Sequence, residues 1–108
     1  MMAELYYFDE CPSYQRALDN LKEALRLERL SEQVAMIRVE SPEDAQAKRF
    51  LGSPTIRLNG IDIEGADAAK QGYAFACRIY LDNGAQAGSP SVGRIRQSLR
   101  DTTSQTKL

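Results

Sequence analysis

This chain of 108 residues contains no histidine, no long apolar run and no excess of positive charge. Without histidine there is no Cys–His nucleophile pair, no mixed cysteine–histidine zinc site and no imidazole to act as a general base. No stretch approaches the roughly 20 apolar residues that a membrane-spanning helix needs. These absences exclude several common hydrolase and metal-site chemistries, and no membrane partner is expected.

Charge is balanced, with 14 lysines and arginines against 15 aspartates and glutamates. Nucleic acids and anionic membranes attract proteins through clustered positive charge, so neither is expected as a partner. The basic residues of "RIRQSLR" (94–100) recur at helical spacing and predict a solvated helix face. No basic region leads into an apolar run at the N-terminus, and there are two cysteines, so we expect a reducing cytoplasmic location with two free thiols.

The chain length suits one α/β domain, which we expect over residues 1–101, followed by a polar flexible tail over 102–108. Periodicity predicts strands and helices in alternation, at 4–8 (strand), 12–30 (helix), 34–40 (strand), 42–51 (helix) and 55–65 (strands), with a last helix after Ser89-Pro90. The β-α-β opening requires parallel strands, and the following hairpin adds antiparallel ones. The prediction is a mixed central sheet with helices on both faces, plus an extra β-hairpin near residues 73–88.

Local signals support the second helix and the hairpin. Ser41 is a good N-cap, Pro42 fits the first helical position, and Gly52 is expected just after the helix end. Asn59-Gly60 lies between alternating residues and predicts a tight turn between two antiparallel strands.

Cys11 lies where the first strand is expected to give way to the first helix. With Pro12 at the first helical position, Cys11 would be the N-cap, facing unpaired N–H groups and the positive end of the helix dipole. Such a position stabilises a thiolate and lowers a cysteine pKa. The position therefore predicts a reactive nucleophile rather than an inert core thiol.

Two short motifs resemble the thioredoxin superfamily. Cys11-Pro12-Ser13-Tyr14 resembles the glutaredoxin motif Cys-Pro-x-Cys, and Ser53-Pro54-Thr55 resembles the cis-proline segment that faces the active-site cysteine. The resemblance implies a thioredoxin-like fold, a nucleophilic Cys11, a cis bond before Pro54, and a peptide- or glutathione-binding edge beside it. Pro12, Tyr14, Ser53, Pro54 and Thr55 are then the expected substrate-binding residues.

Tyr14 stands where the second cysteine of the glutaredoxin motif would be. A packing role is expected for Tyr14, although its hydroxyl could also hydrogen-bond a thiolate. Without the second cysteine, a mixed disulfide on Cys11 must be resolved by an external thiol such as glutathione, acting as co-substrate, or by Cys77.

Cys77 belongs to the strand-like segment "YAFACRIYL" (73–81). An alternating strand would place Tyr73, Phe75, Cys77 and Ile79 on the core side and Arg78 on the other side. A buried structural thiol and a resolving thiol are both left open for Cys77. Arg78 is expected to form a surface ion pair, or to hold a carboxylate such as Asp9 or the glycyl end of glutathione.

Asp9, close before Cys11, is a candidate proton donor or acceptor for the sulfur, or simply a solvated loop residue. The leading hypothesis is a small thiol–disulfide oxidoreductase acting on protein or small-molecule thiols and disulfides, with no resident cofactor or metal. One alternative is a thiol protein that handles soft metals or organomercurials through Cys11, Cys77 and Asp9. Another is a non-catalytic module that binds a peptide or partner at the Pro54 edge.

Overall fold

The computed structural model describes residues 1–65, 68, 72–82 and 84–105, and within them strands and helices alternate as the sequence predicts. The elements are β1 (Ala3–Tyr7), α1 (Tyr14–Leu27), β2 (Ala35–Arg38), α2 (Pro42–Ala47), β3 (Thr55–Leu58), β4 (Ile61–Asp62), β5 (Tyr80–Asp82), β6 (Ala85–Ala87) and α3 (Val92–Gln105).

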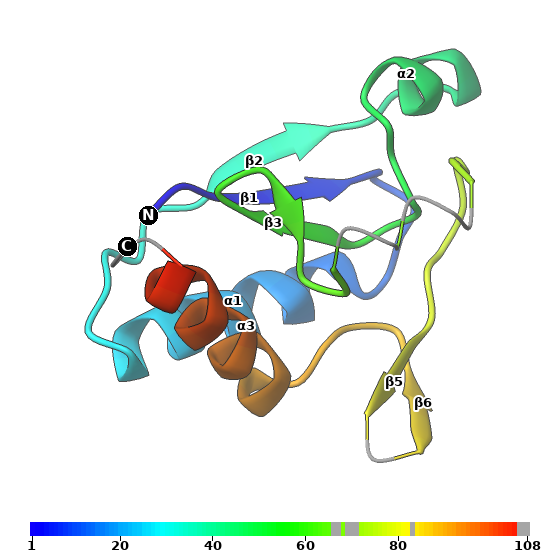
Figure 1. The fold of residues 1–108 in the computed structure, drawn as a ribbon. Helices are drawn as coiled ribbons and strands as arrows, with labels where there is room; N and C mark the ends of the chain where they lie inside the picture. Colours follow the sequence, from blue (N-terminus) through cyan, green and yellow to red (C-terminus); the bar gives the residue numbers. More distant parts are fainter. Residues whose placement is uncertain (66–67, 69–71, 83, 106–108) are drawn as a thin grey trace.

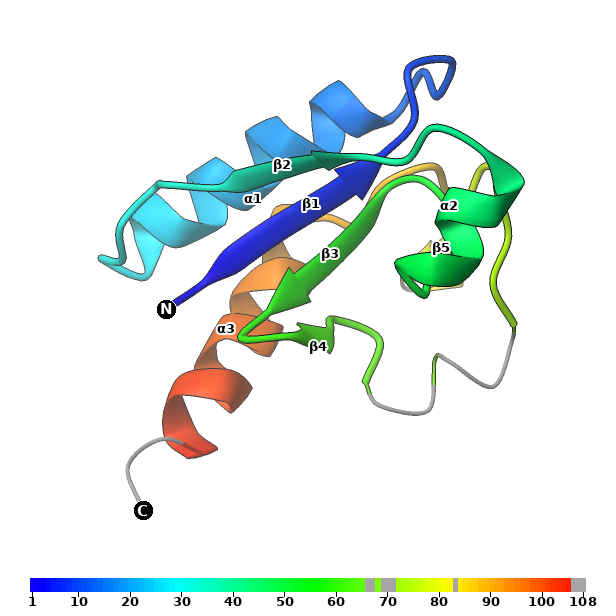
Figure 2. The same ribbon diagram turned by 90° about the horizontal axis from the view of Figure 1, so that it is seen from above.

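Four strands form one mixed sheet in the order β2-β1-β3-β4 (Figure 2). β1 pairs in parallel with β2 and antiparallel with β3, so that Leu5 is aligned with Met36 on one side and with Ile56 on the other. β4 extends the sheet through a short antiparallel pairing with β3. The mixed sheet expected from the β-α-β opening and the hairpin is confirmed.

The sheet separates two layers of helix. α1 and α3 pack together on one face, and α2 lies toward the other face at one end of the sheet (Figure 1). The larger apolar core fills the α1–α3 side and includes Leu5, Leu21, Ile56 and Leu99. A smaller cluster contains Tyr6, Phe8, Cys11, Val39, Ala45 and Phe50. Cys11 is thus part of this second apolar layer.

Both α1 and α2 end with an arginine in the left-handed conformation, Arg29 at φ 59° and Arg49 at φ 55°. After α2 the N–H groups of Arg49 and Phe50 reach back to the carbonyls of Gln46 and Ala45, which closes the helix in a Schellman motif. This turn carries Phe50 into the core, where it is fully buried. The prediction that Gly52 ends this helix is therefore wrong, because the chain turns three residues earlier.

The other local predictions here are confirmed. The Ser41 hydroxyl accepts a hydrogen bond from the Asp44 N–H at 3.0 Å, with Pro42 in the first turn. Asn59 and Gly60 both adopt positive φ, at 52° and 84°, as the tight turn between β3 and β4 requires.

The last helix runs further than expected. Residues 102–105 were predicted to be a flexible tail, but α3 continues to Gln105 because Leu99 is fully buried and Thr102 and Thr103 hydrogen-bond the carbonyls of Ser98 and Leu99. The remainder of that predicted tail, 106–108, lies outside the described residues. Among the helices described, none combines the length and the apolar character needed to cross a bilayer.

Candidate functional site

Cys11 follows β1 in a tight loop. Its N–H donates to the Phe8 carbonyl at 3.1 Å, and α1 begins two residues after Pro12, with Ser13 as its N-cap. The prediction that Cys11 is the N-cap and Pro12 the first helical residue is wrong, because the chain makes a further turn before the helix starts. Cys11 precedes the N-cap by two residues, so its chemistry depends on its neighbours in space.

The Cys11 side chain is almost completely enclosed. Only 2% of it is exposed, and it packs in the second apolar cluster with Phe8 and Phe50. Its Sγ lies 3.5 Å from the Ser53 carbonyl, to which it donates a hydrogen bond. The first strand's loop and the Ser53-Pro54 loop are therefore joined through this sulfur.

The Ser53-Pro54 peptide bond is cis, as expected. Ser53, Pro54 and Thr55 are all buried, and the Ser53 hydroxyl accepts from the Phe8 N–H at 3.4 Å. These three residues were expected to offer a substrate-binding edge. The structure brings them next to Cys11, but their side chains are part of the packed interior.

The backbone N–H and carbonyl of Ser53 are both hydrogen-bonded to another segment of the chain. The Ser53 N–H donates to the Ala76 carbonyl at 2.8 Å, and the Ser53 carbonyl accepts from the Arg78 N–H at 2.9 Å. These bonds form an isolated parallel bridge in which Cys77 is the residue aligned with Ser53. Residues 74–79, the Cys77 segment, thus cross the Ser53-Pro54 loop and bond to it through this one bridge.

Gly52 permits this close crossing. It adopts φ 118°, and a Cβ placed there would lie 3.0 Å from the Arg78 Cβ and 3.2 Å from the Ala76 carbonyl oxygen. Any larger residue would press against the Cys77 segment as well as straining its own backbone. Gly52 therefore allows two segments to approach closely, rather than ending a helix as its sequence position predicts.

The Arg78 side chain holds the Cys77 segment in place. Its guanidinium donates two hydrogen bonds to the Asp62 carboxylate, at 2.7 and 2.9 Å, and a longer one to the Thr55 hydroxyl. It also lies over the ring of Tyr80, whose hydroxyl donates to the Pro54 carbonyl. The expected surface ion pair, and the alternative partners Asp9 and glutathione, are replaced by a buried pair with Asp62.

This anchoring reverses the expected faces from Cys77 onward, whereas Phe75 packs against the second apolar cluster as expected. Regular strand geometry begins only at Tyr80, and the predicted hairpin is confined to β5 and β6. Arg78 and Tyr80 are buried, whereas Cys77 and Ile79 are exposed. The prediction of a core-facing Cys77 is wrong, because Asp62 and the Pro54 carbonyl offer polar partners that draw the alternate side chains inward.

Both thiols are free, and the Cys11 sulfur lies near enough to Cys77 to influence its pKa. Partial loss of hydration, followed by the charge of the Cys11 sulfur and a hydrogen bond with it, raises the pKa of the Cys77 thiol. Cys77 is thus the solvent-exposed neighbour of the buried Cys11 thiol. No group of three or more metal-ligating side chains exists among the described residues.

The other predicted site residues lie around this pair. Asp9 forms an ion pair with Arg38 at 2.9 Å, with both side chains about half exposed, and within the described chain it makes no hydrogen bond to either sulfur. Tyr14 stacks on Tyr7 with ring centroids 4.5 Å apart, as the packing interpretation expects. Pro12 is exposed, and Ser13 meets Gly88, where an added Cβ would clash with its hydroxyl.

The site is completed by Gly52, Asp62, Arg78 and Tyr80, in roles that the sequence alone does not predict. One signal was present: a charged residue inside the aromatic and apolar stretch 73–81 needs a partner if it is buried. The partner's identity could not be read from the sequence, since sixteen positions separate Arg78 from Asp62.

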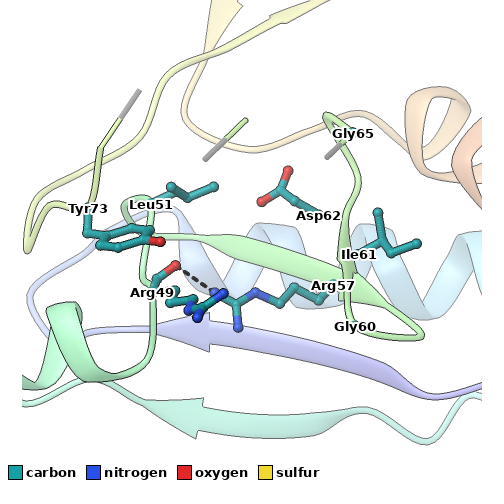
Figure 3. A pocket seen from close by; sticks show the side chains of 8 residues that line it. All are labelled: Arg49, Leu51, Arg57, Gly60, Ile61, Asp62, Gly65 and Tyr73. Atoms are coloured by element: carbon teal, nitrogen blue, oxygen red, sulfur yellow. Dashed lines mark hydrogen bonds between the residues drawn. The ribbon is translucent and has the colours of Figure 1, made fainter. Parts of the chain in front are cut away.

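A separate cavity of about 220 Å³ lies beside the β3–β4 hairpin (Figure 3). Its lining residues are Arg49, Leu51, Arg57, Gly60, Ile61, Asp62, Gly65 and Tyr73. Arg57 donates to the carbonyls of Lys48 and Arg49, and Asp62 is held by Arg78. Because neither cysteine lines this cavity and two of its charged groups are engaged in the fold, the thiol pair is the better candidate site.

Comparison with protein-family models, curated proteins and solved structures finds no match to this chain. The class of protein therefore rests on the α/β fold and the paired thiols themselves.

Proposed function

We propose that this protein is a thioredoxin-like thiol–disulfide oxidoreductase in which Cys11 and Cys77 form the redox pair. The observation that carries the proposal is the bridge between Ser53 and Cys77. It fixes the backbone on both sides of Cys77 while the Ser53 carbonyl also binds the Cys11 sulfur. The Cys11 side chain and the Cys77 backbone are thus held at one peptide group, which supports exchange between the two thiols.

The reaction transfers two electrons. The reduced pair loses two electrons and two protons to become a Cys11–Cys77 disulfide, while the substrate disulfide gains them and leaves as two thiols. Of the two ways of resolving a mixed disulfide, by an external thiol or within the Cys11–Cys77 pair, the proximity of the sulfurs supports the pair. Glutathione is then a reductant of the oxidised protein, and the pair itself completes the exchange.

The arrangement of the fold also supports this class. The element order, the cis bond before Pro54 and the position of Cys11 at the end of β1 are the features on which the resemblance to glutaredoxins depends. The substitution of Tyr14 for the second cysteine is compensated by a thiol that arrives from a distant segment.

The test is oxidation of the reduced protein by diamide, followed by intact mass measurement and peptide mapping. We expect loss of two hydrogens per chain, a Cys11–Cys77 linked peptide pair, and glutathione-dependent reduction of bis(2-hydroxyethyl) disulfide. Cys11→Ser and Cys77→Ser are the matched controls, and neither can form the internal disulfide. A wild-type chain that yields only intermolecular disulfides and no turnover would contradict the proposal.

The same thiol pair supports a second candidate, binding of a soft metal ion. Two thiolates suit a two-coordinate ion such as Cu⁺ or Hg²⁺, which prefer sulfur ligands. The Asp9 carboxylate is bound to Arg38, so proton delivery by Asp9 to an organomercurial gains no support from the geometry. Titration of the reduced protein with Hg²⁺ tests this candidate: one equivalent should be retained by the wild type and lost to a competing thiol by Cys77→Ser. Equal retention by both proteins would exclude a paired site.

The third hypothesis, a peptide-binding module at the Pro54 edge, loses its main support. Both backbone groups of Ser53 already bond the Cys77 segment, so an incoming peptide would have to displace residues 76–78.

A further inference from the structure

The two cysteines differ sharply in access to solvent. Cys11 is 2% exposed and packs among aromatic side chains, whereas Cys77 lies on the surface. Ala76 and Ile79 are also exposed, so Cys77 lies in a stretch of chain that is open to solvent. Thiol–disulfide exchange needs the attacking sulfur to reach its target in line with the breaking bond. The buried sulfur cannot be reached in this way while the Cys77 segment stays in place.

Resting on the function proposed above, we propose that the mixed disulfide with the external substrate forms on Cys77, and that Cys11 is the resolving sulfur. This reverses the roles that the sequence motif implies. It also assigns the substrate class: a small-molecule disulfide, since the Ser53 backbone that would pair with an extended peptide is bonded to Ala76 and Arg78.

The exchange proceeds in two balanced steps. Cys77 attacks one sulfur of the small disulfide, forms a new S–S bond to it and releases the other half as a thiol that takes up the Cys77 proton. Cys11 then attacks the Cys77 sulfur, and the second half of the substrate leaves as a thiol with the Cys11 proton. In the reverse direction an external thiolate attacks the exposed Cys77 sulfur of the oxidised pair, and Cys11 departs first.

The contacts of the pair agree with this order. The Cys11 sulfur donates to the Ser53 carbonyl, and the same carbonyl accepts from the Arg78 N–H next to Cys77, so both residues stay at one peptide group while the proton released by the attack goes to the leaving thiol. The segment that carries Cys77 is held by the Arg78–Asp62 pair, so Cys77 remains over Cys11 while the substrate is attached.

The experiment compares reduced Cys11→Ser and Cys77→Ser in their reaction with oxidised glutathione. Each rate is measured in the native state and divided by the rate of the same variant in denaturant, so that intrinsic reactivity cancels. We expect Cys11→Ser to accumulate a glutathione adduct on Cys77 with a native rate close to the denatured one. In Cys77→Ser, burial should slow adduct formation on Cys11 by about tenfold or more, since exchange rates depend on access as well as ionisation.

Limited alkylation of the wild type by iodoacetamide provides a second measurement that needs no substitution. Peptide mapping should find the first label on Cys77. An adduct that forms preferentially on Cys11, together with first labelling of Cys11, would overturn the role assignment. The proposed function would still stand in that case if diamide produced the Cys11–Cys77 disulfide, and it would fall independently if no such disulfide formed.

Discussion

The Arg78 guanidinium and the Asp62 carboxylate form a bidentate ion pair at 2.7 and 2.9 Å, with side chains 6% and 7% exposed. Removing one partner of a buried pair leaves an uncompensated charge in the interior, which costs about 3–5 kcal/mol. We therefore expect Asp62→Asn to lower the free energy of unfolding by about this amount, measured by urea denaturation. Asp9→Asn, which breaks the half-exposed pair with Arg38, is the matched control and should have a much smaller effect. Equal losses in the two variants would contradict the anchoring role of Asp62.

Gly52 is predicted to control the approach of the Cys77 segment. Gly52→Ala places a Cβ within 3.0 Å of Arg78 and forces a side chain into φ 118°, a combination expected to cost about 1–3 kcal/mol from backbone strain, with contact repulsion in addition. Formation of the Cys11–Cys77 disulfide by diamide should also slow. Gly65→Ala, at φ 97° and with no contact within 4 Å of the added Cβ among the described residues, should share the strain but leave the rate of disulfide formation unchanged.

Tyr80→Phe should destabilise the Pro54 end of the site. The variant removes the hydrogen bond from the Tyr80 hydroxyl and leaves the buried Pro54 carbonyl without that donor, a loss of about 1–3 kcal/mol. Urea denaturation at neutral pH measures the loss. Tyr14→Phe is a suitable control, because Tyr14 stacks on Tyr7 through its ring and should retain that contact without the hydroxyl. A Tyr80→Phe protein as stable as the wild type would show that this hydrogen bond does not stabilise the fold.

The same tyrosine predicts a dependence on alkaline pH. Burial raises the pKa of Tyr80 in the folded protein, while in the unfolded chain it returns to about 10. The contribution of Tyr80 to the free energy of unfolding is therefore complete below about pH 10. Above that pH it is lost, because the unfolded chain gives up a proton that the native state retains. The difference in unfolding free energy between wild type and Tyr80→Phe should shrink from about pH 9 to about pH 11. A constant difference over this range would contradict the prediction.

Cys11→Ser is expected to make Cys77 more reactive. The pKa of Cys77 is raised first by partial desolvation and second by the Cys11 sulfur. The serine variant replaces that sulfur with an uncharged hydroxyl and so removes the second cause. The pKa of Cys77 should fall, so its rate of alkylation at a fixed pH near neutrality should increase. The measurement is the iodoacetamide rate of Cys77 against pH in both proteins. A Cys77 profile that does not move would show that the two sulfurs are uncoupled.

Much of the fold could be predicted because its signals are local. Ser41 caps α2 with its own hydroxyl, and Asn59-Gly60 adopts the positive φ values that a tight hairpin requires. The strand and helix order follows from periodicity in the same way. Predictions were wrong where contacts with distant residues decided the outcome. α2 ends early because Phe50 packs in the core, and α3 is longer than expected because Leu99 is buried.

The candidate site shows the same division. Cys11 and the cis bond before Pro54 could be recognised from two short motifs, since each depends on adjacent residues. The orientation of Cys77 could not, because alternation applies to a regular strand, and at Cys77 the backbone forms an isolated bridge rather than a continuous ladder.

By itself, the sequence determined the order of elements, the caps and turns, and the presence of two thiols with no histidine to assist them. Tertiary structure alone decided which thiol is enclosed, which is open, and that the two are neighbours. The physical reason is that caps and turns satisfy hydrogen bonds within a few residues. The meeting of Cys11 and Cys77 instead depends on burying Arg78 against Asp62 across the folded chain.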